Sequence, residues 1–364
     1  TGFHRTLEDE FYLQRENPSY YRANHTNFVN GFGLSGRHDV SEKFSINHSA
    51  QFTYDNMKAS KTIFNNKEEP WDLRQGYFTD RKYSKISLLP QYNYALSKDE
   101  EIAYKIGISW DDSNRDKQRF SPIAEISWTR IESDNQSENI FLSYSESTQV
   151  LGYGAIGGPE GSGTFQSTHD LNRSISRNLE LGLKLVRRNW SLNGAIFHRW
   201  DDDLVDWTYS SPTFTPRIAN HADIETFGFE VIASRQIDKF QVISSYAYLK
   251  KEENYQNANV RGSFYALNYP EHRATLGLIW NPLDVLQIRI DNEWRQQREN
   301  EIRHDTGAPN KSILSHFAAS YYPSAFDELE LFVAFDKPWE KEFQDIPGIA
   351  PRGDQFSFGL TYSW

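Results

Sequence analysis

The chain has 364 residues, a mass of 42.4 kDa, a formal net charge of −11, no cysteine and 15% aromatic residues. The negative charge argues against nucleic-acid binding, which requires clustered lysine and arginine. The absence of cysteine excludes disulfide bonds and thiolate metal sites. A spanning helix needs about 20 consecutive apolar residues, and the sequence contains no such stretch, in keeping with a mean hydropathy of −0.72.

Apolar and polar residues alternate along almost the whole chain, which predicts strands with two different faces. After an expected first strand near 1–13, the alternation is clear at 44–54 and 102–110. One face of the next clear strand carries only leucine: Leu179, Leu181, Leu183 and Leu185. At 286–291 the polar face carries charged side chains, which would be costly in a dry core but not in a water-filled lumen.

The last strand shows the cleanest alternation. Its apolar face is entirely large: Phe356, Phe358, Leu360, Tyr362 and Trp364. Its other face carries only serine, threonine and glycine. A strand that is apolar toward lipid and polar toward a lumen is typical of a membrane barrel.

Short turns alternate with long polar segments from one end of the chain to the other. The short turns lie near 39–43, 97–100, 188–190, 236–239 and 281–284. The long segments lie near 55–82, 150–176, 201–225, 250–271, 297–311 and 342–354. Membrane barrels have short periplasmic turns and long extracellular loops, so the chain is predicted to be an all-β transmembrane antiparallel β-barrel of roughly 16 strands, a single domain over 1–364 with its C-terminus in the periplasm.

Aromatic residues have two expected roles. Six of them are predicted to form the interfacial girdles of the barrel, namely Tyr94, Trp110, Trp128, Trp200, Trp280 and Trp294. Seven others lie in the long segments, namely Tyr153, Trp207, Tyr209, Tyr255, Phe264, Tyr265 and Tyr269. Rigid rings suit recognition of a large amphipathic ligand, and packing between the loops is the alternative role.

Three other sequence features could suggest a binding or catalytic site, and each is interpreted without one. GYGAIG at 152–157 matches a dinucleotide-binding pattern, but no helix follows to receive a pyrophosphate, so a glycine-rich loop is expected. Acidic residues beside His198, His221 and His304 are interpreted as hydrated side chains at the rim, because their spacing fits no metal motif. The sequence lacks G-x-S-x-G, and neither a catalytic residue nor a cofactor is expected.

Several segments resemble the C-terminal part of TonB-dependent outer-membrane transporters. The similar segments are THDLNRSISRNLELGLKLVRRNWSLNGAIFHRWDDDLVDW, NHADIETFGFEVIASRQI, FQVISSYAYLK, PEHRATLGLIWNP and DIPGIAPRGDQFSFGLTYSW, in that order between about residues 140 and 364. The resemblance implies that Tyr362 and Trp364 belong to the barrel-assembly signal. It also implies a receptor for a scarce ligand, such as a ferric siderophore, haem, cobalamin or another metal complex.

The family pattern also contains an N-terminal plug and about 22 strands, which this chain does not show. A chain that forms part of a 22-stranded barrel, with its plug on a longer parent chain or on a separate one, is therefore expected. The implied partners are outer-membrane lipid and lipopolysaccharide, the barrel-assembly machinery, the ligand, and TonB through the plug, all in a Gram-negative outer membrane. A complete 16-stranded porin for small hydrophilic solutes and a barrel scaffold in an envelope complex stay open as alternatives.

Overall fold

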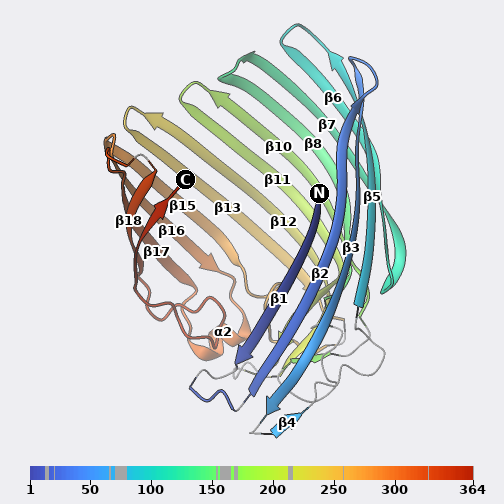
Figure 1. The fold of residues 1–364 in the computed structure, drawn as a ribbon, viewed down its shortest axis with the longest axis vertical. Helices are drawn as coiled ribbons and strands as arrows, with labels where there is room; N and C mark the ends of the chain where they lie inside the picture. Colours follow the sequence, from blue (N-terminus) through green and yellow to red (C-terminus); the bar gives the residue numbers. More distant parts are fainter. Residues whose placement is uncertain are drawn as a thin grey trace.

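In the computed structural model the chain forms one curved β-sheet (Figure 1). The structure describes residues 1–364 except 13–15, 20, 65–66, 70–79, 153–154, 156–164, 168–170, 212–215, 257, 327 and 364. Within the described residues, sixteen strands are long: β1 (Gly2–Tyr12), β2 (Tyr21–Asp39), β3 (Phe44–Phe64), β5 (Asp80–Ala95), β6 (Glu100–Ser113), β7 (Asp116–Ser133), β8 (Gln136–Gln149), β10 (Ser174–Arg187), β11 (Trp190–Tyr209), β12 (Arg217–Ile237), β13 (Phe240–Asn254), β15 (Pro270–Leu283), β16 (Leu286–Gln297), β17 (Lys311–Tyr321), β18 (Leu329–Pro338) and β19 (Gln355–Tyr362).

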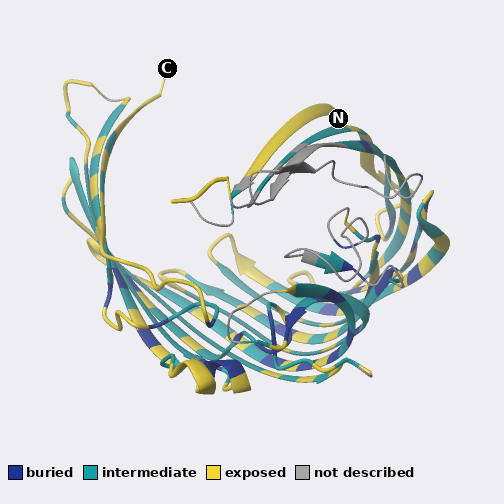
Figure 2. Cartoon of the chain, turned by 90° about the horizontal axis from the view of Figure 1, so that it is seen from below, coloured by how far each residue is buried: buried dark blue, intermediate teal, exposed yellow. Residues whose placement is uncertain are grey.

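Each long strand pairs antiparallel with the next long strand along the chain. Among the described residues no pairing joins β1 to β19, and Figure 2 shows a gap between the two chain ends. The sixteen long strands confirm the predicted strand number and the all-β class, and β1 confirms the first expected strand. The sheet is a wide, open part of a barrel wall.

Strand register gives the sheet two chemically distinct faces. One row of directly paired residues across β3 to β10 is apolar or aromatic: Phe44, Tyr92, Tyr104, Ile126, Leu142 and Leu181. The row beside it, on the opposite face, is polar: Ser45, Gln91, Lys105, Glu125, Ser143 and Glu180. The first face is called the outer face here and the second the inner face.

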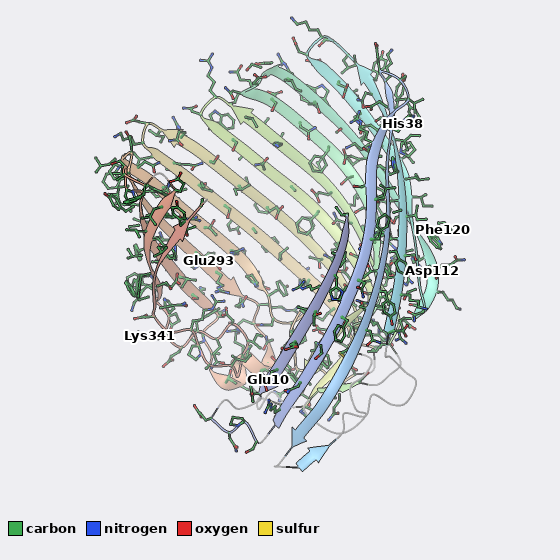
Figure 3. All side chains as sticks on the ribbon, in the orientation of Figure 1. Glu10, His38, Asp112, Phe120, Glu293 and Lys341 are labelled. Carbon is green, nitrogen blue, oxygen red and sulfur yellow. The ribbon has the colours of Figure 1, made fainter. Side chains whose placement is uncertain are left out.

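Burial identifies the inner face as the concave one. Serines on this face are buried although they are small and face no second layer of sheet, as at Ser45, Ser109, Ser121 and Ser127. Side chains converge on the concave side of a curved sheet, whereas they diverge on the convex side. Large apolar residues of the outer face are accordingly exposed, up to 79% at Phe358, and Phe120 projects away from the molecule (Figure 3). The convex apolar face suits lipid and the concave polar face suits water.

The connections also differ between the two ends of the sheet. At the end called the short-turn end, strands are joined by residues 40–43, 96–99, 134–135, 188–189, 238–239 and 284–285. The opposite, long-loop end carries most of the longer connections, together with the short strands β4 (Lys67–Glu69), β9 (Phe165–Ser167) and β14 (Gly262–Ser263) (Figure 1). This asymmetry agrees with the predicted alternation, although β6 and β7 meet there in the short connection 114–115.

Two of the predicted long loops are shorter than the sequence indicated. Segment 201–225 is mostly strand, because β11 continues to Tyr209 and β12 begins at Arg217. Likewise, β3 continues to Phe64, inside the predicted loop 55–82. The acidic residues that indicated a loop include some that are buried within the strands, namely Asp55, Asp201 and Asp206. A β-bulge between Asp201 and Leu204 shifts the register of β11 against β12 within the acidic segment.

The described residues contain one regular helix, α2 (Glu301–Thr306), between β16 and β17. Asn300 caps its N-terminus, since the Asn300 side chain accepts a hydrogen bond from the backbone N–H of Arg303. Gly307 ends the helix with a φ of 65°, a conformation that favours glycine. Among all the residues that the structure describes, no helix is both long and apolar enough to cross a membrane.

Candidate functional site

Three connections gather at the long-loop end and are called the loop cap: residues 255–269, 298–310 and 339–354. The cap is attached to the tips of β11 and β12, which extend beyond their other strand neighbours. There β14 pairs antiparallel with Thr208 and Tyr209 of β11, and β9 pairs parallel with β12. Segments distant in sequence therefore form a small sheet around the β11–β12 hairpin.

Asp206 fastens the first cap loop to β11. Its carboxylate is completely buried and accepts hydrogen bonds from the Tyr255 hydroxyl (2.8 Å) and the backbone N–H groups of Tyr265 (3.1 Å) and Ala266 (3.0 Å). Burial and the neighbouring Asp206 carboxylate raise the pKa of Tyr255 far above its ordinary value. Tyr255 therefore stays protonated and remains a donor to Asp206.

Apolar contacts join the cap loops to one another. Tyr209 and Ile302 are both buried and pack with Phe264 and Ile346, so that β11, the first loop, α2 and the last loop meet in one cluster. The Phe264 ring lies edge-on to Tyr209, with 6.2 Å between centroids. Burial raises the pKa of Tyr209 to about 12.

Cations stack on two aromatic rings of the cap. The Lys251 Nζ lies 4.7 Å from the centre of the Tyr269 ring, and the Arg298 guanidinium carbon lies 5.8 Å from it. Arg298 also forms a two-bonded ion pair with Glu253, at 2.6 and 2.9 Å. Phe343 is held in the same way by Arg295 (5.1 Å) and Arg303 (5.5 Å). A cation–π contact stabilises a fold most when water is excluded from it, and both of these rings are buried.

Arg303 links all three cap loops through oxygen atoms of neutral groups. Its guanidinium donates to the Pro309 carbonyl (2.7 Å), the Gln344 carbonyl (3.0 Å) and the Asn268 side chain (3.3 Å). Burial, the main cause, lowers the pKa of Arg303. Because each loop supplies an acceptor, the position of Arg303 fixes the loops relative to one another.

The predicted ligand-binding residues that the structure describes lie in this cap or at the tip of β11 that supports it. Tyr209 and Tyr269 are buried, Trp207, Tyr255 and Phe264 are half-buried, and Tyr265 is 52% exposed. Tyr265 thus presents its ring to solvent while Asp206 holds its backbone. Tyr153 and Trp364 lie outside the described residues, and Tyr362 is exposed on the outer face of β19.

Sequence reasoning did not identify Asp206, Arg303 or Phe343. Asp206 stands in the run DDDLVDW, where nothing in the sequence distinguishes it from the other three aspartates. A signal for Arg303 exists only in the Asn300 and Gly307 pair that bounds a helix of one or two turns. The roles of all three residues arise from contacts between segments far apart in the sequence, which a local sequence pattern does not reveal.

Two of the histidine–acid groups named from the sequence form close pairs. His198 Nε2 lies 2.7 Å from Glu225, and His221 Nδ1 lies 3.6 Å from Asp203. In the described part of the chain, no three histidine or acidic side chains converge as a metal would require. By strand register, all six residues predicted to form the girdles lie on the outer face, namely Tyr94, Trp110, Trp128, Trp200, Trp280 and Trp294.

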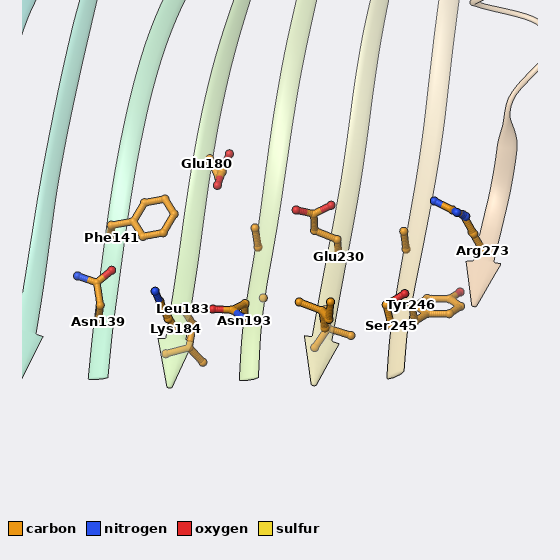
Figure 4. Close-up of a pocket in the computed structure, with 15 residues that line it drawn as sticks. Asn139, Phe141, Glu180, Leu183, Lys184, Asn193, Glu230, Ser245, Tyr246 and Arg273 are labelled. Carbon is orange, nitrogen blue, oxygen red and sulfur yellow. The ribbon is translucent and has the colours of Figure 1, made fainter. Parts of the chain in front are cut away.

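A groove of about 410 Å³ runs along the inner face, across β8, β10, β11, β12 and β13 (Figure 4). Phe141, Glu180, Lys184 and Glu230 line it, with asparagine side chains beside them. Elsewhere on the inner face charges are paired within the wall, as in Lys105–Glu125 (2.7 Å) and Arg289–Asp291 (2.5 Å). The inner wall therefore carries charged side chains from β6 and β7 to β16.

Residues 2–328 match the family described as TonB dependent receptor-like, beta-barrel. The fold is similar to that of the copper transporter OprC, with a TM-score of 0.68, 11% identity, and coverage of 100% of this chain and 61% of that one. It also resembles the FrpB iron transporter of Neisseria meningitidis (F5-1 variant; TM-score 0.62, 13% identity, 99% and 61% covered).

A third similar structure is the siderophore receptor PiuA of Acinetobacter baumannii (TM-score 0.58, 12% identity, 99% and 61% covered). At such low identity the likeness concerns the fold alone. The chain spans about three fifths of the length of these relatives. No curated protein sequence matches it.

Proposed function

Since the chain belongs to the TonB dependent receptor-like β-barrel family, we propose that it forms the outer-membrane wall of a TonB-dependent transporter for a scarce ligand. The ligand class is a ferric siderophore, haem, cobalamin or another metal complex. Structural relatives named as copper and iron transporters and as a siderophore receptor support this class. The chemistry is binding and passage of the ligand, without covalent catalysis.

The observation that carries the proposal is the opposite character of the two faces. An apolar convex face matches the lipid of a Gram-negative outer membrane, and a charged concave face matches a hydrated passage. The loop cap then lies outside the cell and the short turns lie in the periplasm. In our proposal the plug that couples to TonB gates this passage.

The parts beyond this chain complete the proposed transporter. Residues 1–364 form one barrel domain within a 22-stranded wall, and the plug is carried on a longer parent chain or on a separate one. Tyr362 and Trp364 belong to the signal read by the barrel-assembly machinery. Lipopolysaccharide surrounds the outer face beside the cap.

Ligand capture is assigned to the aromatic residues of the long-loop end. Tyr265 offers an exposed ring on a fixed backbone, so it is the most direct contact candidate. Trp207 and Tyr255 border the same region, and Tyr153 is proposed from its sequence position. Tyr209 and Tyr269 are buried and are assigned a supporting role.

The test is uptake by living cells of the source bacterium. Cells with and without the gene for the parent protein, each in a TonB-positive and a TonB-deficient background, are given radiolabelled iron as citrate and siderophore complexes, haem, cobalamin and copper. The proposal expects one compound whose uptake needs both the protein and TonB. If all protein-dependent uptake continued without TonB and included small sugars, an open porin would explain the data instead.

A further inference from the structure

Residues 171–173 lie just before β10 at the long-loop end and are fastened to the wall on two sides. On one side, the backbone N–H of Arg173 donates to the Asp116 carboxylate, at the start of β7, at 3.0 Å. On the other side, the backbone N–H of Asn172 donates to Nε2 of His221, in β12, at 3.2 Å. Strands β8, β10 and β11 separate β7 from β12 in the sheet. This short segment therefore joins parts of the wall that are not neighbours.

The contact with Asn172 fixes the position of the proton on the imidazole ring. A backbone N–H can only donate, so the Nε2 atom that accepts it carries a lone pair and no proton. The proton of the neutral ring is then on Nδ1, which lies 3.6 Å from a carboxylate oxygen of Asp203 in β11. The neutral Nδ1–H tautomer of His221 is therefore the form that this arrangement holds.

Protonation of the ring would break the fastening to β12. A charged imidazole donates from both nitrogens and accepts at neither, so the N–H groups of Nε2 and of Asn172 would face each other. The Asn172 N–H would lose its acceptor, and the two donors would repel. Histidine is the side chain that ordinarily changes charge between pH 5 and 8, so mild acid is the natural trigger.

The charged groups around His221 can accommodate an imidazolium. Asp203 faces Nδ1 from β11, and Asp223, two residues along β12, accepts the backbone N–H of Asp203 at 3.0 Å. From the opposite side, Asp116 of β7 lies beside Arg173. Arg173 is the cation of the segment, and its ion pairs with aspartates offset its charge. A second proton on the ring would thus not leave an uncompensated charge.

We propose that His221 is a pH-sensitive fastening, which holds residues 171–173 on β12 when it is neutral and releases them when it is protonated. The other side keeps its hold through the ion pairs of Arg173 with Asp111 of β6 and Asp116 of β7, because arginine stays charged. Acid would therefore loosen the long-loop end between β10 and β12. This device goes beyond the proposed transport function, since it requires neither TonB nor a particular ligand.

The experiment measures hydrogen exchange of the Asn172 amide at pH 8 and pH 5 in the native parent protein purified in detergent. The exchange rate of an unstructured peptide at the same pH, divided by the measured rate, gives a protection factor. The test variant is His221→Gln, whose amide oxygen can accept the Asn172 N–H but does not titrate. The matched control is His198→Gln, because His198 also lies beside a carboxylate, 2.7 Å from Glu225. Crystal structures of the wild type at both pH values give a second readout that needs no variant.

The expected result is a protection factor for Asn172 that falls about fivefold or more from pH 8 to pH 5 in the wild type and in His198→Gln, and stays constant in His221→Gln. The wild-type structures should show the hydrogen bond from Asn172 N to His221 Nε2 at pH 8 and its loss at pH 5. An equal fall in His221→Gln would assign the effect to another group and overturn the inference. A constant wild-type protection factor, or a hydrogen bond that survives at pH 5, would overturn it as well.

Discussion

At the scale of single residues, the loop cap depends on buried polar groups with defined partners. Asp206 accepts three hydrogen bonds, and Arg303 donates to three loops. Hydrogen bonds to charged groups are worth about 1.5–3 kcal/mol each, and a buried group that loses its partner costs about as much. The cap should therefore respond to substitutions that remove one polar atom and leave the volume unchanged.

Asp206→Asn tests this dependence. The amide nitrogen of asparagine would face backbone N–H donors, so the first cap loop should open more readily, by about 1–3 kcal/mol. Hydrogen exchange of residues 258–269 measures the change, and their amides should exchange at least several-fold faster. Asp354→Asn, which alters an exposed ion pair with Lys337, is the control. Unchanged exchange in Asp206→Asn would show that the cap does not depend on this carboxylate.

Tyr209 gives a prediction about pH. Burial raises its pKa to about 12, whereas an unfolded tyrosine ionises near 10. The folded cap thus holds the proton more tightly than the unfolded chain. The stabilising contribution is complete below pH 10 and is lost as the pH rises from 10 to about 12.

The measurement is a titration at 295 nm of the wild type minus Tyr209→Phe, which isolates one phenol. The difference curve should have its midpoint near 12. A midpoint near 10 would mean that Tyr209 is accessible to water in the folded protein.

At the scale of elements, glycine and aromatic residues pair directly across neighbouring strands on the inner wall. In four such pairs the ring lies where a glycine Cβ would stand: Gly31 and Phe3, Gly182 and Phe141, Gly228 and Phe197, and Gly359 and Phe332. The absent side chain lets the ring lie flat across the neighbouring strand. The pairs therefore fill the concave surface without obstructing the lumen.

Gly182→Ala should destabilise the barrel wall. The added methyl group would collide with the Phe141 ring and force it off its position, at a cost of about 1–3 kcal/mol. Folded barrels resist detergent until heated, so the temperature at which the purified protein unfolds in an electrophoresis assay should fall. Gly194→Ala serves as the control, because its Cβ would meet the nearest atom at an ordinary 3.5 Å. An equal shift in both variants would attribute the effect to loss of glycine rather than to the ring.

The strands themselves could be predicted from alternation, but their ends could not. Leu179 to Leu185 indicated the outer face of β10 correctly, because lipid and water select opposite residues on every strand. Asp201 to Asp203 and Asp206 indicated a loop, yet they lie in β11. Buried aspartates with hydrogen-bond partners, such as Asp206, and the β-bulge after Asp201 interrupt the period-two pattern there. The contacts of Arg303 were unpredictable, since they join loops distant in sequence.

At the scale of the whole molecule, the two rows of side chains should tolerate charge differently. Leu181→Arg would place a cation on the outer face, where a barrel loses about 2–4 kcal/mol near the membrane midplane. Ser143→Arg would place the same side chain on the inner face, directly across from Glu180. Chemical unfolding of the native protein in lipid vesicles should show a large loss for the first variant and little for the second. Similar losses would contradict the assignment of outer and inner faces.

The central claim is that this wall belongs to a gated transporter and not to an open channel. The most direct test is the ion conductance of the native protein, purified from outer membranes and inserted into planar lipid bilayers. A plugged transporter should be nearly silent at moderate voltage, because the lumen enclosed by the polar inner wall is filled. Steady, stepwise opening to a large conductance would contradict the account and identify the protein as a porin.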